Sequence, residues 1–423
     1  MHYINYKANK KHFTEQKEEL ETKLSEPYIE RDVEANIKSP LVKVILGPRR
    51  SGKSFYALHM LHSLGTFAYI NFDDERILNI DRDEILHSAL SFYKNPKTIF
   101  LDEIQNLDKW ELFVNRLYRS NYNLFITGSN SHLLSSELAS ALTGRHTKIL
   151  IFPFSFKEFL LWRFKKDLKD VSSHKIKSAF EKYLKDGGYP EPLVKELNYR
   201  EYLSLLVDSI LYKDISARYN IRYVSELRDL FYYVISNFSQ QLSFRKLASY
   251  CTIGSVHTVR KYLFYLEEAF LIFPLRRFSW KVKEQLKAPP KYYAIDNGII
   301  DSFSFKISPS YGWLLENLIA IKLRKYQMQN KIDIFYFLSN FGEIDFVIKK
   351  GNKVVMLLQV SYVSDIPPKK DLAPLLYASK LLKCNNLLFI TKDIELEDTF
   401  SWHGVKRKIK FIPAWKFMLT KLF

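Results

Sequence analysis

One eight-residue segment constrains the fold more than any other part of the sequence: Gly47-Pro48-Arg49-Arg50-Ser51-Gly52-Lys53-Ser54. It follows a short apolar run, residues 41–46, and precedes residues 55–64, which have the composition of a helix. A strand, a glycine-rich turn, Gly-Lys-Ser and a helix are the order that a phosphate-binding loop requires. The alternative is a chance match, which the flanking strand and helix disfavour. The sequence therefore predicts a nucleoside triphosphate site here.

The residue types in the loop suit phosphate binding. Glycines let the backbone curl so that its N–H groups point at phosphate oxygens, and the helix N-terminus adds partial positive charge. We expect Lys53 to reach the β- and γ-phosphates and the Ser54 hydroxyl to ligate Mg²⁺. We count residues 47–54 and the next residue, Phe55, as nucleotide-binding.

A pair of acids follows about 50 residues downstream. Residues 97–101 read as a buried strand, and Asp102 and Glu103 end it. Asp102 is placed to hold the Mg²⁺ shell, and Glu103 to orient and polarise the attacking water. Two acids at a strand end can also form a solvated turn, but the upstream phosphate loop favours the catalytic interpretation.

Two further positions fit the same site. The strand at residues 124–128 leads into small polar groups, and Thr127 or Ser129 could sense the γ-phosphate. Arg145 precedes the strand expected at residues 148–152, and it could reach a γ-phosphate in its own subunit or in a neighbour. The alternatives are an ordinary turn for the first and a helix-capping surface arginine for the second.

These strands alternate with helical segments, including one expected at residues 132–142, until about Pro153. Alternation of this kind predicts an α/β core in which helices wrap a parallel sheet and the loops converge at the carboxyl ends of the strands. The polar residues 1–38 read as an arm that leads into this core, with a surface helix near residues 13–24.

Composition bounds the remaining classes. The chain has 423 residues, enough for two to four domains. It has no apolar run long enough to cross a bilayer, no signal-peptide core, and two distant cysteines, Cys251 and Cys384. We therefore expect a cytoplasmic protein with unpaired thiols and no membrane partner.

The net charge of +18 is unevenly placed. Residues 1–150 hold 20 basic and 19 acidic side chains, which leaves 44 basic and 27 acidic ones beyond residue 150. Such a field attracts phosphate polymers. The basic half therefore predicts contact with nucleic acid, with DNA favoured over RNA; a lysine-rich protein kept soluble by its charge is the alternative.

Residues 155–223 have helical patterns, interrupted by the turn Gly187-Gly188-Tyr189-Pro190. Residues 224–285 read as helix, glycine turn, helix and extended chain, which fits a winged helix-turn-helix. The exposed start of its second helix would carry Ser255, His257, Thr258 and Lys261, where base edges are read. A winged helix that only bridges two domains has the same pattern.

After Pro289-Pro290, residues 313–390 read as a helix, three strands, a helix and a strand. The helix carries Glu316, one strand begins near Asp345, and another ends at Gln359. Strands that are adjacent in sequence commonly pair, so these polar groups are expected to lie near one another.

Residues 40–155 resemble an AAA+-type P-loop ATPase, of the archaeal and bacterial group between the AAA+ and STAND classes that carries an uncharacterised C-terminal domain. The motifs are the phosphate loop, Leu101-Asp102-Glu103-Ile104-Gln105, Ile126-Thr127-Gly128-Ser129 and Gly144-Arg145. The resemblance implies ATP, Mg²⁺ and hydrolysis, with Thr127 or Ser129 as sensor 1 and Arg145 as the arginine finger. It also implies that Pro190 packs on the adenine, as in STAND ATPases.

The last domain is similar to the PD-(D/E)xK restriction-endonuclease fold. The similarity makes Glu316 the helix carboxylate, Asp345 the metal-binding aspartate and Gln359 the first residue of the (Glu/Gln)-x-Lys motif. Ser361 stands where the catalytic lysine belongs, so we expect a degenerate nuclease fold. A lysine supplied by another strand would restore an active nuclease.

The sequence thus predicts five parts: an arm at 1–38, a P-loop ATPase core at 39–155, a helical lid at 156–223, a winged helix at 224–288 and a nuclease-like domain at 289–423. The favoured function is a Mg²⁺-dependent ATPase, a switch or motor whose basic half contacts DNA or RNA. A STAND-like ATPase that recruits protein partners and an ATP-regulated nuclease are the alternatives. Homo-oligomerisation stays open, because Arg145 acting on a neighbour would require it.

Overall fold

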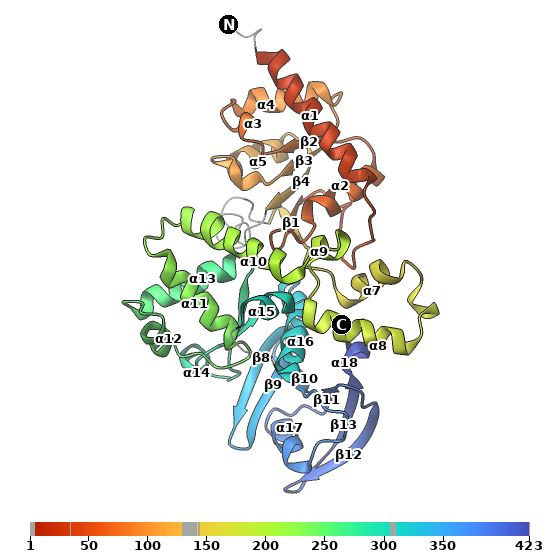
Figure 1. Cartoon of the computed structure of the whole chain (residues 1–423), viewed down its shortest axis with the longest axis vertical. Helices are drawn as coiled ribbons and strands as arrows, with labels where there is room; N and C mark the ends of the chain where they lie inside the picture. The colour runs from red at the N-terminus through yellow and green to blue at the C-terminus, as the bar shows by residue number, and fades with distance from the viewer. Residues whose placement is uncertain (1–4, 34, 129–141, 143, 305–309, 423) are drawn as a thin grey trace. The chain divides into compact units, whose positions relative to one another are not determined.

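The computed structural model describes residues 5–33, 35–128, 142, 144–304 and 310–422. The chain divides into two compact units, one formed by residues 1–153 with 268–270 and the other by residues 154–267 and 271–423. Figure 1 shows the elements of both units in chain order by colour.

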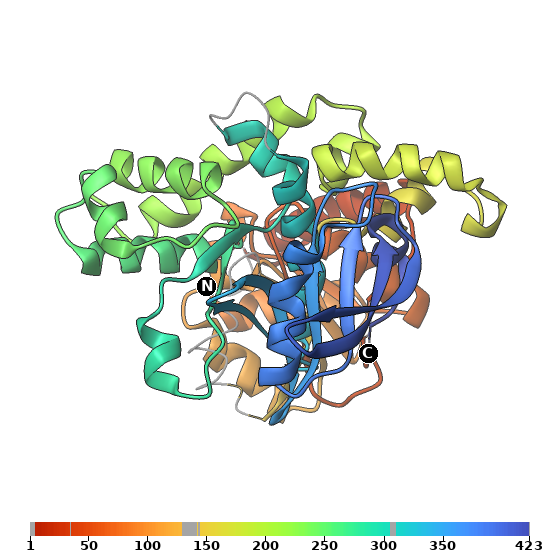
Figure 2. The ribbon, with the colours of Figure 1, turned by 90° about the horizontal axis from the view of Figure 1, so that it is seen from below.

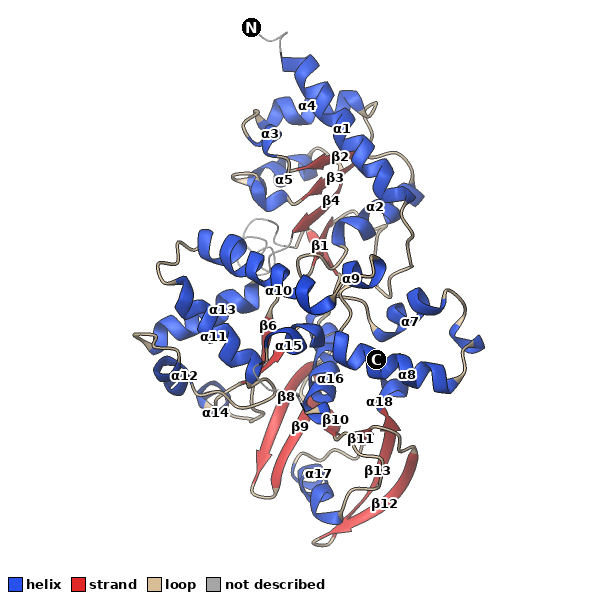
Figure 3. Cartoon of the chain, in the orientation of Figure 1, coloured by secondary structure: helices blue, strands red, loops and turns tan. Residues whose placement is uncertain are grey.

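The first unit is built on a five-stranded sheet. Its strands are β1 (Val42–Leu46), β2 (Ala68–Asn71), β3 (Thr98–Asp102), β4 (Asn123–Gly128) and β5 (His146–Leu150). All neighbours are parallel, in the order β2-β3-β4-β1-β5. Figure 3 shows β2, β3, β4 and β1 of this sheet. The strands are apolar and mostly buried, as expected for a parallel sheet covered on both faces. The predicted parallel α/β core is therefore present.

Helices surround this sheet: α1 (Asn5–Ser25), α2 (Lys53–Leu64), α3 (Glu75–Leu78), α4 (Arg82–Phe92), the 3₁₀ turn η1 (Ile104–Asn106) and α5 (Trp110–Arg119). Side chains of α1 and α2 join the sheet in one core, for example Leu20, Leu58 and Phe100. Two boundaries differ from expectation, because α1 is much longer than the predicted surface helix and β5 begins two residues earlier. Nearly all of the helix expected at 132–142 falls outside the described residues.

The second unit begins with helices: α7 (Phe156–Phe164), the 3₁₀ turn η3 (Leu168–Asp170), α8 (Ser173–Asp186), α9 (Pro190–Val194) and α10 (Tyr199–Ser209), which continues as the π-helix η4 (Ile210–Ala217). Next come α11 (Val224–Ser236), α12 (Phe244–Tyr250) and α13 (Val256–Glu268). Strands β6 (Ile272–Leu275) and β7 (Lys291–Ala294) pair antiparallel, and α14 (Val282–Lys287) lies between them in sequence.

A six-stranded mixed sheet completes the second unit. After α15 (Asn297–Phe303) and α16 (Tyr311–Met328) come β8 (Asp333–Ser339), β9 (Gly342–Lys350), β10 (Lys353–Val360), α17 (Lys369–Leu381), β11 (Leu387–Thr391), β12 (Leu396–Trp402), β13 (Val405–Pro413) and α18 (Ala414–Leu419). The strand order is β12-β13-β11-β10-β9-β8. The predicted order from helix to fourth strand is present; β12, β13 and α18 were not predicted.

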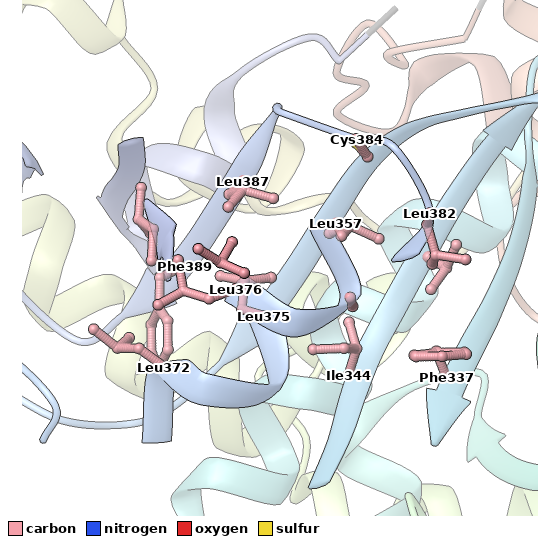
Figure 4. Close-up of a cluster of buried hydrophobic side chains, with 14 of the residues drawn as sticks. Phe337, Ile344, Leu357, Leu372, Leu375, Leu376, Leu382, Cys384, Leu387 and Phe389 are labelled. Carbon is pink, nitrogen blue, oxygen red and sulfur yellow. The ribbon is translucent and has the colours of Figure 1, made fainter. Parts of the chain in front are cut away.

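Helix α17 covers one face of this sheet. Leu372, Leu375 and Leu376 point from the helix toward strand residues that include Leu357 and Phe389 (Figure 4). Cys384 joins this core, and Cys251 is also buried; both are free thiols. Among the described residues, no helix is both long and apolar enough to span a membrane.

Candidate nucleotide site and a buried ionic cluster

The phosphate loop connects β1 to α2. Gly47 has a φ of +153°, and a Cβ there would lie 1.9 Å from the backbone oxygen of Ile151, so no side chain fits. Gly52, just before α2, has a φ of +89°, in the region that only glycine adopts without strain. The two glycines are thus required by the local backbone, which curls toward the N-terminus of α2.

Lys53 and Ser54 open helix α2. Lys53 is only 4% exposed, and its Nζ donates to the carbonyl oxygen of Pro48 at 2.9 Å, so the ammonium lies over the loop. The Ser54 Oγ donates to Asp102 Oδ1 at 2.8 Å. The structure therefore joins the loop to the first acid of the acid pair, which is 48 residues away in sequence.

Asp102 is held by three hydroxyl groups. Besides Ser54, the Tyr69 hydroxyl donates to Asp102 Oδ2 at 3.1 Å, and the Thr127 hydroxyl donates to Oδ1. Burial raises the pKa of Asp102, the charge of Glu103 raises it further, and the hydrogen bonds from Thr127 and Ser54 oppose both effects. A cation beside a buried carboxyl group stabilises its charged form, so this position suits a bound cation.

Thr127 lies between the two acids and the loop because of the strand order. Strand β4 separates β1 from β3, with Thr127 opposite Ile45 and Ile126 opposite Leu101. The Thr127 hydroxyl accepts from the backbone N–H of Glu103 at 2.9 Å while it donates to Asp102. Of the two sensor candidates, Thr127 is thus in contact with both acids; Ser129 lies outside the described residues.

Glu103 follows the strand in a left-handed conformation, with a φ of 49°. Its Oε2 accepts from the Gln105 side-chain amide at 2.5 Å. The backbone is fixed by Thr127, and the carboxylate is fixed by Gln105. Because the chain changes to a positive φ at Glu103, directly after β3, the backbone at the second acid no longer follows the direction of the strand that ends at Asp102.

The donor set near Ser54 fits Mg²⁺, which prefers hydroxyl, carboxylate and water oxygens. Ser54 and Asp102 already meet through their oxygen atoms, and Asp102 is buried. No group of three or more histidine, cysteine or acidic side chains suited to a metal occurs among the described residues, so this pair would need phosphate and water oxygens to complete a shell.

Arg145 lies at the amino end of the parallel strands, whereas the phosphate loop follows the carboxyl end of β1. It immediately precedes β5, whose first residue His146 pairs with Val42 at the start of β1, and its carbonyl accepts from Val42 N at 2.9 Å. The phosphate loop follows the other end of β1, roughly 15 Å away at about 3.3 Å per residue. The backbone of Arg145 therefore lies at the amino end of β1, away from the loop, which disfavours its own subunit's γ-phosphate; contact with a γ-phosphate, in this subunit or a neighbour, stays a prediction.

Sequence reasoning missed one contact to the phosphate loop and one to the helix α2 that follows it. Arg31 is buried, and it donates to the carbonyl oxygens of Ser51 at 3.0 Å and Phe152 at 2.6 Å. Tyr28 stacks on His59 with ring centroids 4.1 Å apart, and Phe55 lies 4.6 Å from His59. Residues 28–31 thus brace the phosphate loop, although the sequence suggested only a polar arm there.

Pro190 is the first residue of α9 in the second unit, and its role toward adenine stays a prediction. The turn before it is held by Asp296, whose carboxylate accepts from Gly188 N at 2.7 Å and from Gly298 N at 2.9 Å. The neighbouring Asn297 donates to the carbonyl oxygen of Leu184 at 2.7 Å. Burial raises the pKa of Asp296 to about 7, although both backbone N–H groups act to lower it.

This shift predicts a pH-dependent stability. A carboxyl group whose pKa is raised by folding stabilises the protein fully below its unfolded pKa, and that contribution is lost as the pH rises through about 7. Between pH 5.5 and 8.5 we expect the free energy of unfolding to fall by about 2 kcal/mol through this group. Urea unfolding of the wild type and of Asp296→Asn across this range measures it; equal pH slopes in the two proteins would refute it.

A buried ionic cluster lies in the second unit. Lys291 of β7 is 3% exposed, its Nζ lies 3.0 Å from Glu316 Oε1 on α16, and it also pairs with Glu343 of β9. Tyr293 donates to Glu316 Oε1 at 2.7 Å, and Val360 N donates to Asp345 Oδ2 at 2.7 Å. The predicted acids Glu316 and Asp345 are thus in one cluster, and Lys291 is a member that sequence reasoning missed.

The charges in this cluster depend on one another. Burial alone would lower the pKa of Lys291, but the carboxylates of Glu316, Asp345 and Glu343 raise it above its usual value. Burial raises the pKa of Glu316, and it raises that of Asp345 with help from Glu316. Lys291 therefore stays charged and compensates the acids around it.

The third predicted residue, Gln359, lies near the end of β10, one residue before Val360. Its buried Oε1 has no hydrogen-bond partner among the described residues. Ser361 donates its backbone N–H to Ile390 at 2.9 Å, as a strand residue does. Among the described residues, the Gln359 side chain therefore makes no hydrogen bond through Oε1 to the acids of the cluster.

Of the four proposed nucleic-acid residues, Ser255 precedes α13, and the other three lie in its first two turns. Thr258 N donates to Ser255 Oγ at 3.0 Å, and the two hydroxyl groups also lie 3.0 Å apart, so both serve the helix end. His257 and Lys261 are exposed. Only these two side chains are free of a capping role in the structure.

Comparison with known proteins places the first unit in a defined class. A family model described as an AAA domain matches residues 39–160, and a model described as a domain of unknown function matches residues 177–309. Together with the parallel sheet and the loop between β1 and α2, the first match makes residues 39–160 an AAA-type P-loop ATPase domain.

Two curated relatives cover most of the chain. The uncharacterized protein MJ1544 of Methanocaldococcus jannaschii is 36% identical over 409 residues, which are 93% of this chain and 91% of the relative. An uncharacterized protein of Haemophilus influenzae is 32% identical over 346 residues, 76% of this chain and 82% of the relative. The chain belongs to the family of MJ1544.

Matches among solved structures include the Walker-type ATPase PABY2304 of Pyrococcus abyssi, with 17% identity and a TM-score of 0.41, covering 68% of this chain and 95% of that one. The replication initiator DnaA bound to AMPPCP and single-stranded DNA has 16% identity and a TM-score of 0.28, covering 60% of this chain and 86% of that one.

Proposed function

We propose that this chain binds ATP with Mg²⁺ and hydrolyses it. One observation carries the proposal: hydrogen bonds run from Ser54 to Asp102, from Thr127 to Asp102, and from the backbone of Glu103 to Thr127. This network connects the phosphate loop, the metal-side acid and the second acid within the AAA domain. A phosphate site without hydrolysis would need the first two elements but not a separately positioned Glu103.

Each residue has a distinct task in the proposed reaction. The loop backbone and Lys53 bind the β- and γ-phosphates, while Ser54 and Asp102 hold Mg²⁺. Bound Mg²⁺ would offset the charge that develops on the phosphate oxygens. Glu103 orients a water in line with the γ-phosphate and polarises it. Thr127 keeps the Glu103 backbone fixed relative to Asp102, so a change at the phosphates reaches the acid pair through one hydroxyl group.

The second unit is the proposed output of this site. We assign residues 156–223 as a helical lid, 224–288 as a winged helix and 289–423 as a degenerate PD-(D/E)xK-like domain. The element order α11, α12, α13, β6, β7 supports the winged helix, and the α16–β10 elements with Glu316 and Asp345 support the last domain. We propose that the nucleotide state changes how this basic half engages DNA or RNA.

A steady-state ATPase assay tests the proposal directly. The full chain should hydrolyse ATP only with Mg²⁺, and Lys53→Ala should lose at least about 100-fold of this activity because it removes the charge on the transferred phosphoryl group. Single- or double-stranded DNA or RNA should raise the wild-type rate. Activity that survives in Lys53→Ala would overturn the assignment of the site, and a rate unaffected by every nucleic acid would remove the proposed coupling.

A further inference from the structure

Residues 276–290, called the β6–β7 segment below, connect the two strands of the small sheet and contain α14. Three large apolar side chains stand exposed within seven residues: Trp280 at 62%, Val282 at 66% and Leu286 at 60%. Figure 2 shows α14 in blue-green at the lower left, apart from the helices α11 to α13. Val282 and Leu286 are four residues apart on α14 and so share one face of that helix, and adjoining exposed apolar side chains mark an interaction surface.

The segment is held in place at both ends. Phe278 is buried in the core of the six-stranded sheet, and its backbone N–H donates to the carbonyl oxygen of Tyr336 on β8 at 2.6 Å. At the other end, the Tyr336 hydroxyl donates to the carbonyl oxygen of Pro289 at 2.6 Å. One residue of β8 thus anchors both ends, so the segment between them is presented in a defined position.

Internal hydrogen bonds order the exposed part. Ser279 Oγ donates to Glu284 Oε2 at 2.7 Å and accepts from Lys281 N at 3.1 Å, while Gln285 donates to the Ser279 carbonyl oxygen at 2.5 Å. Trp280 lies against Phe278 with ring centroids 5.1 Å apart. The indole is therefore exposed and also supported by a buried ring.

The β6–β7 segment is strongly basic, which favours a negatively charged partner. Residues 276–290 contain five basic residues and one acid, Glu284, and that acid is paired with Lys281 at 3.4 Å. On α14, Val282 and Leu286 are four residues apart, as are Lys283 and Lys287, so an apolar stripe runs beside a basic one. A basic track with an exposed aromatic ring is the pattern that binds single-stranded nucleic acid.

We propose that the β6–β7 segment binds a single nucleic-acid strand, with Trp280 stacking on an unpaired base and Lys283 and Lys287 contacting phosphates. This inference rests on the proposed nucleic-acid contact and moves its centre from the start of α13 to the β6–β7 segment. An anionic membrane would also attract lysines, but α14 has six residues and is about 9 Å long, short for a helix that lies in a bilayer surface.

Fluorescence anisotropy of the full chain with a labelled oligothymidylate of about 20 nucleotides tests the segment. Trp280→Ala should weaken binding at least about fivefold. Lys283→Gln with Lys287→Gln should lower the slope of log K against log salt by about 1.4. Lys406→Gln with Lys410→Gln is the matched control: these two lysines are also exposed and four residues apart, on β13, and should leave binding unchanged.

The outcomes separate the two proposals. Strong binding by the wild type that Trp280→Ala and the α14 double variant do not alter would overturn this inference and keep the nucleic-acid contact. If the wild type bound no oligonucleotide at low salt, both this inference and the proposed nucleic-acid contact would be wrong. The proposed ATPase activity would not be affected by that result, because we expect the basal rate to be unchanged in all of these variants. If Trp280→Ala weakened binding to vesicles of anionic phospholipid and not to the oligonucleotide, the segment would be a membrane contact and the inference would be wrong.

Discussion

Replacing Glu103 by Gln is expected to lower the rate of ATP hydrolysis at least about 100-fold, the scale of a lost general base. The amide keeps the size of the side chain but cannot polarise the attacking water. Ser54, Asp102 and the loop keep their contacts, because the backbone N–H of Glu103, not its carboxylate, donates to Thr127. Binding of ATP should therefore stay within about threefold of wild type, which single-turnover hydrolysis and equilibrium binding would show together.

The matched control is Glu75→Gln, which removes an exposed carboxylate from the first turn of α3, just after the edge strand β2. It should leave the rate unchanged. Wild-type turnover in Glu103→Gln would refute the role of this residue, whereas loss of binding together with turnover would mean that the substitution damages the phosphate site. The two measurements therefore distinguish a chemical role from a structural one.

The sequence could predict the phosphate site because its chemistry is local. A loop needs its glycines at fixed offsets from Lys53, and an acid pair needs a strand end, so both are visible as short patterns. The position of Thr127 between the acids and the loop depends on strand order, and no short pattern specifies that β4 lies between β1 and β3. The contacts of Thr127 required the fold.

For Arg145, the predicted topology already favoured one of the two alternatives. A residue just before a strand lies at the amino end of that strand. In a parallel sheet all amino ends lie on one side, and the loop that follows β1 lies on the other. The motif resemblance favoured a γ-phosphate contact and left the choice of subunit open. The predicted topology alone already disfavoured contact with the subunit's own phosphate, and the contact with a neighbour stays a prediction.

Lys291 shows what the sequence could not provide. It is 25 residues from Glu316 and 52 from Glu343, and it begins a short strand whose other residues are apolar or aromatic. A lysine at a strand end usually points to solvent, since lysine is rarely buried without a partner. Its partners come from α16 and β9, so burial of this side chain follows only from the way β7 packs in the second unit.

Removing the Lys291 ammonium is the other change with a large expected effect. Lys291→Met keeps most of the side-chain volume but leaves Glu316 and Glu343 without their shared cation. Loss of one partner from a buried ion pair costs about 3–5 kcal/mol, and we expect a destabilisation on this scale in urea unfolding at pH 8. The loss should be smaller at pH 5.5, because the acids can then bind protons and shed their unpaired charge.

A matched control and a rescue make this prediction specific. Lys349→Met breaks the 3.7 Å ion pair with Asp333 on the same sheet, where Asp333 is half exposed, and it should cost at most about 1 kcal/mol. Adding Glu316→Gln to Lys291→Met should recover part of the stability by removing one buried charge. Equal losses in Lys291→Met and Lys349→Met would contradict a closed ionic cluster.

The same cluster bears on the proposed nuclease-like site, in which Ser361 stands where the resemblance expects a lysine. Carboxylates that are buried together repel one another, and they need a cation whether or not the site performs chemistry. Lys291 supplies that cation from β7, in direct contact with Glu316 and Glu343. If this ammonium is what balances the acids, a chelator such as EDTA should leave the unfolding of the wild type unchanged. A chelator-sensitive transition in the second unit would mean instead that a metal ion shares the cluster with Lys291.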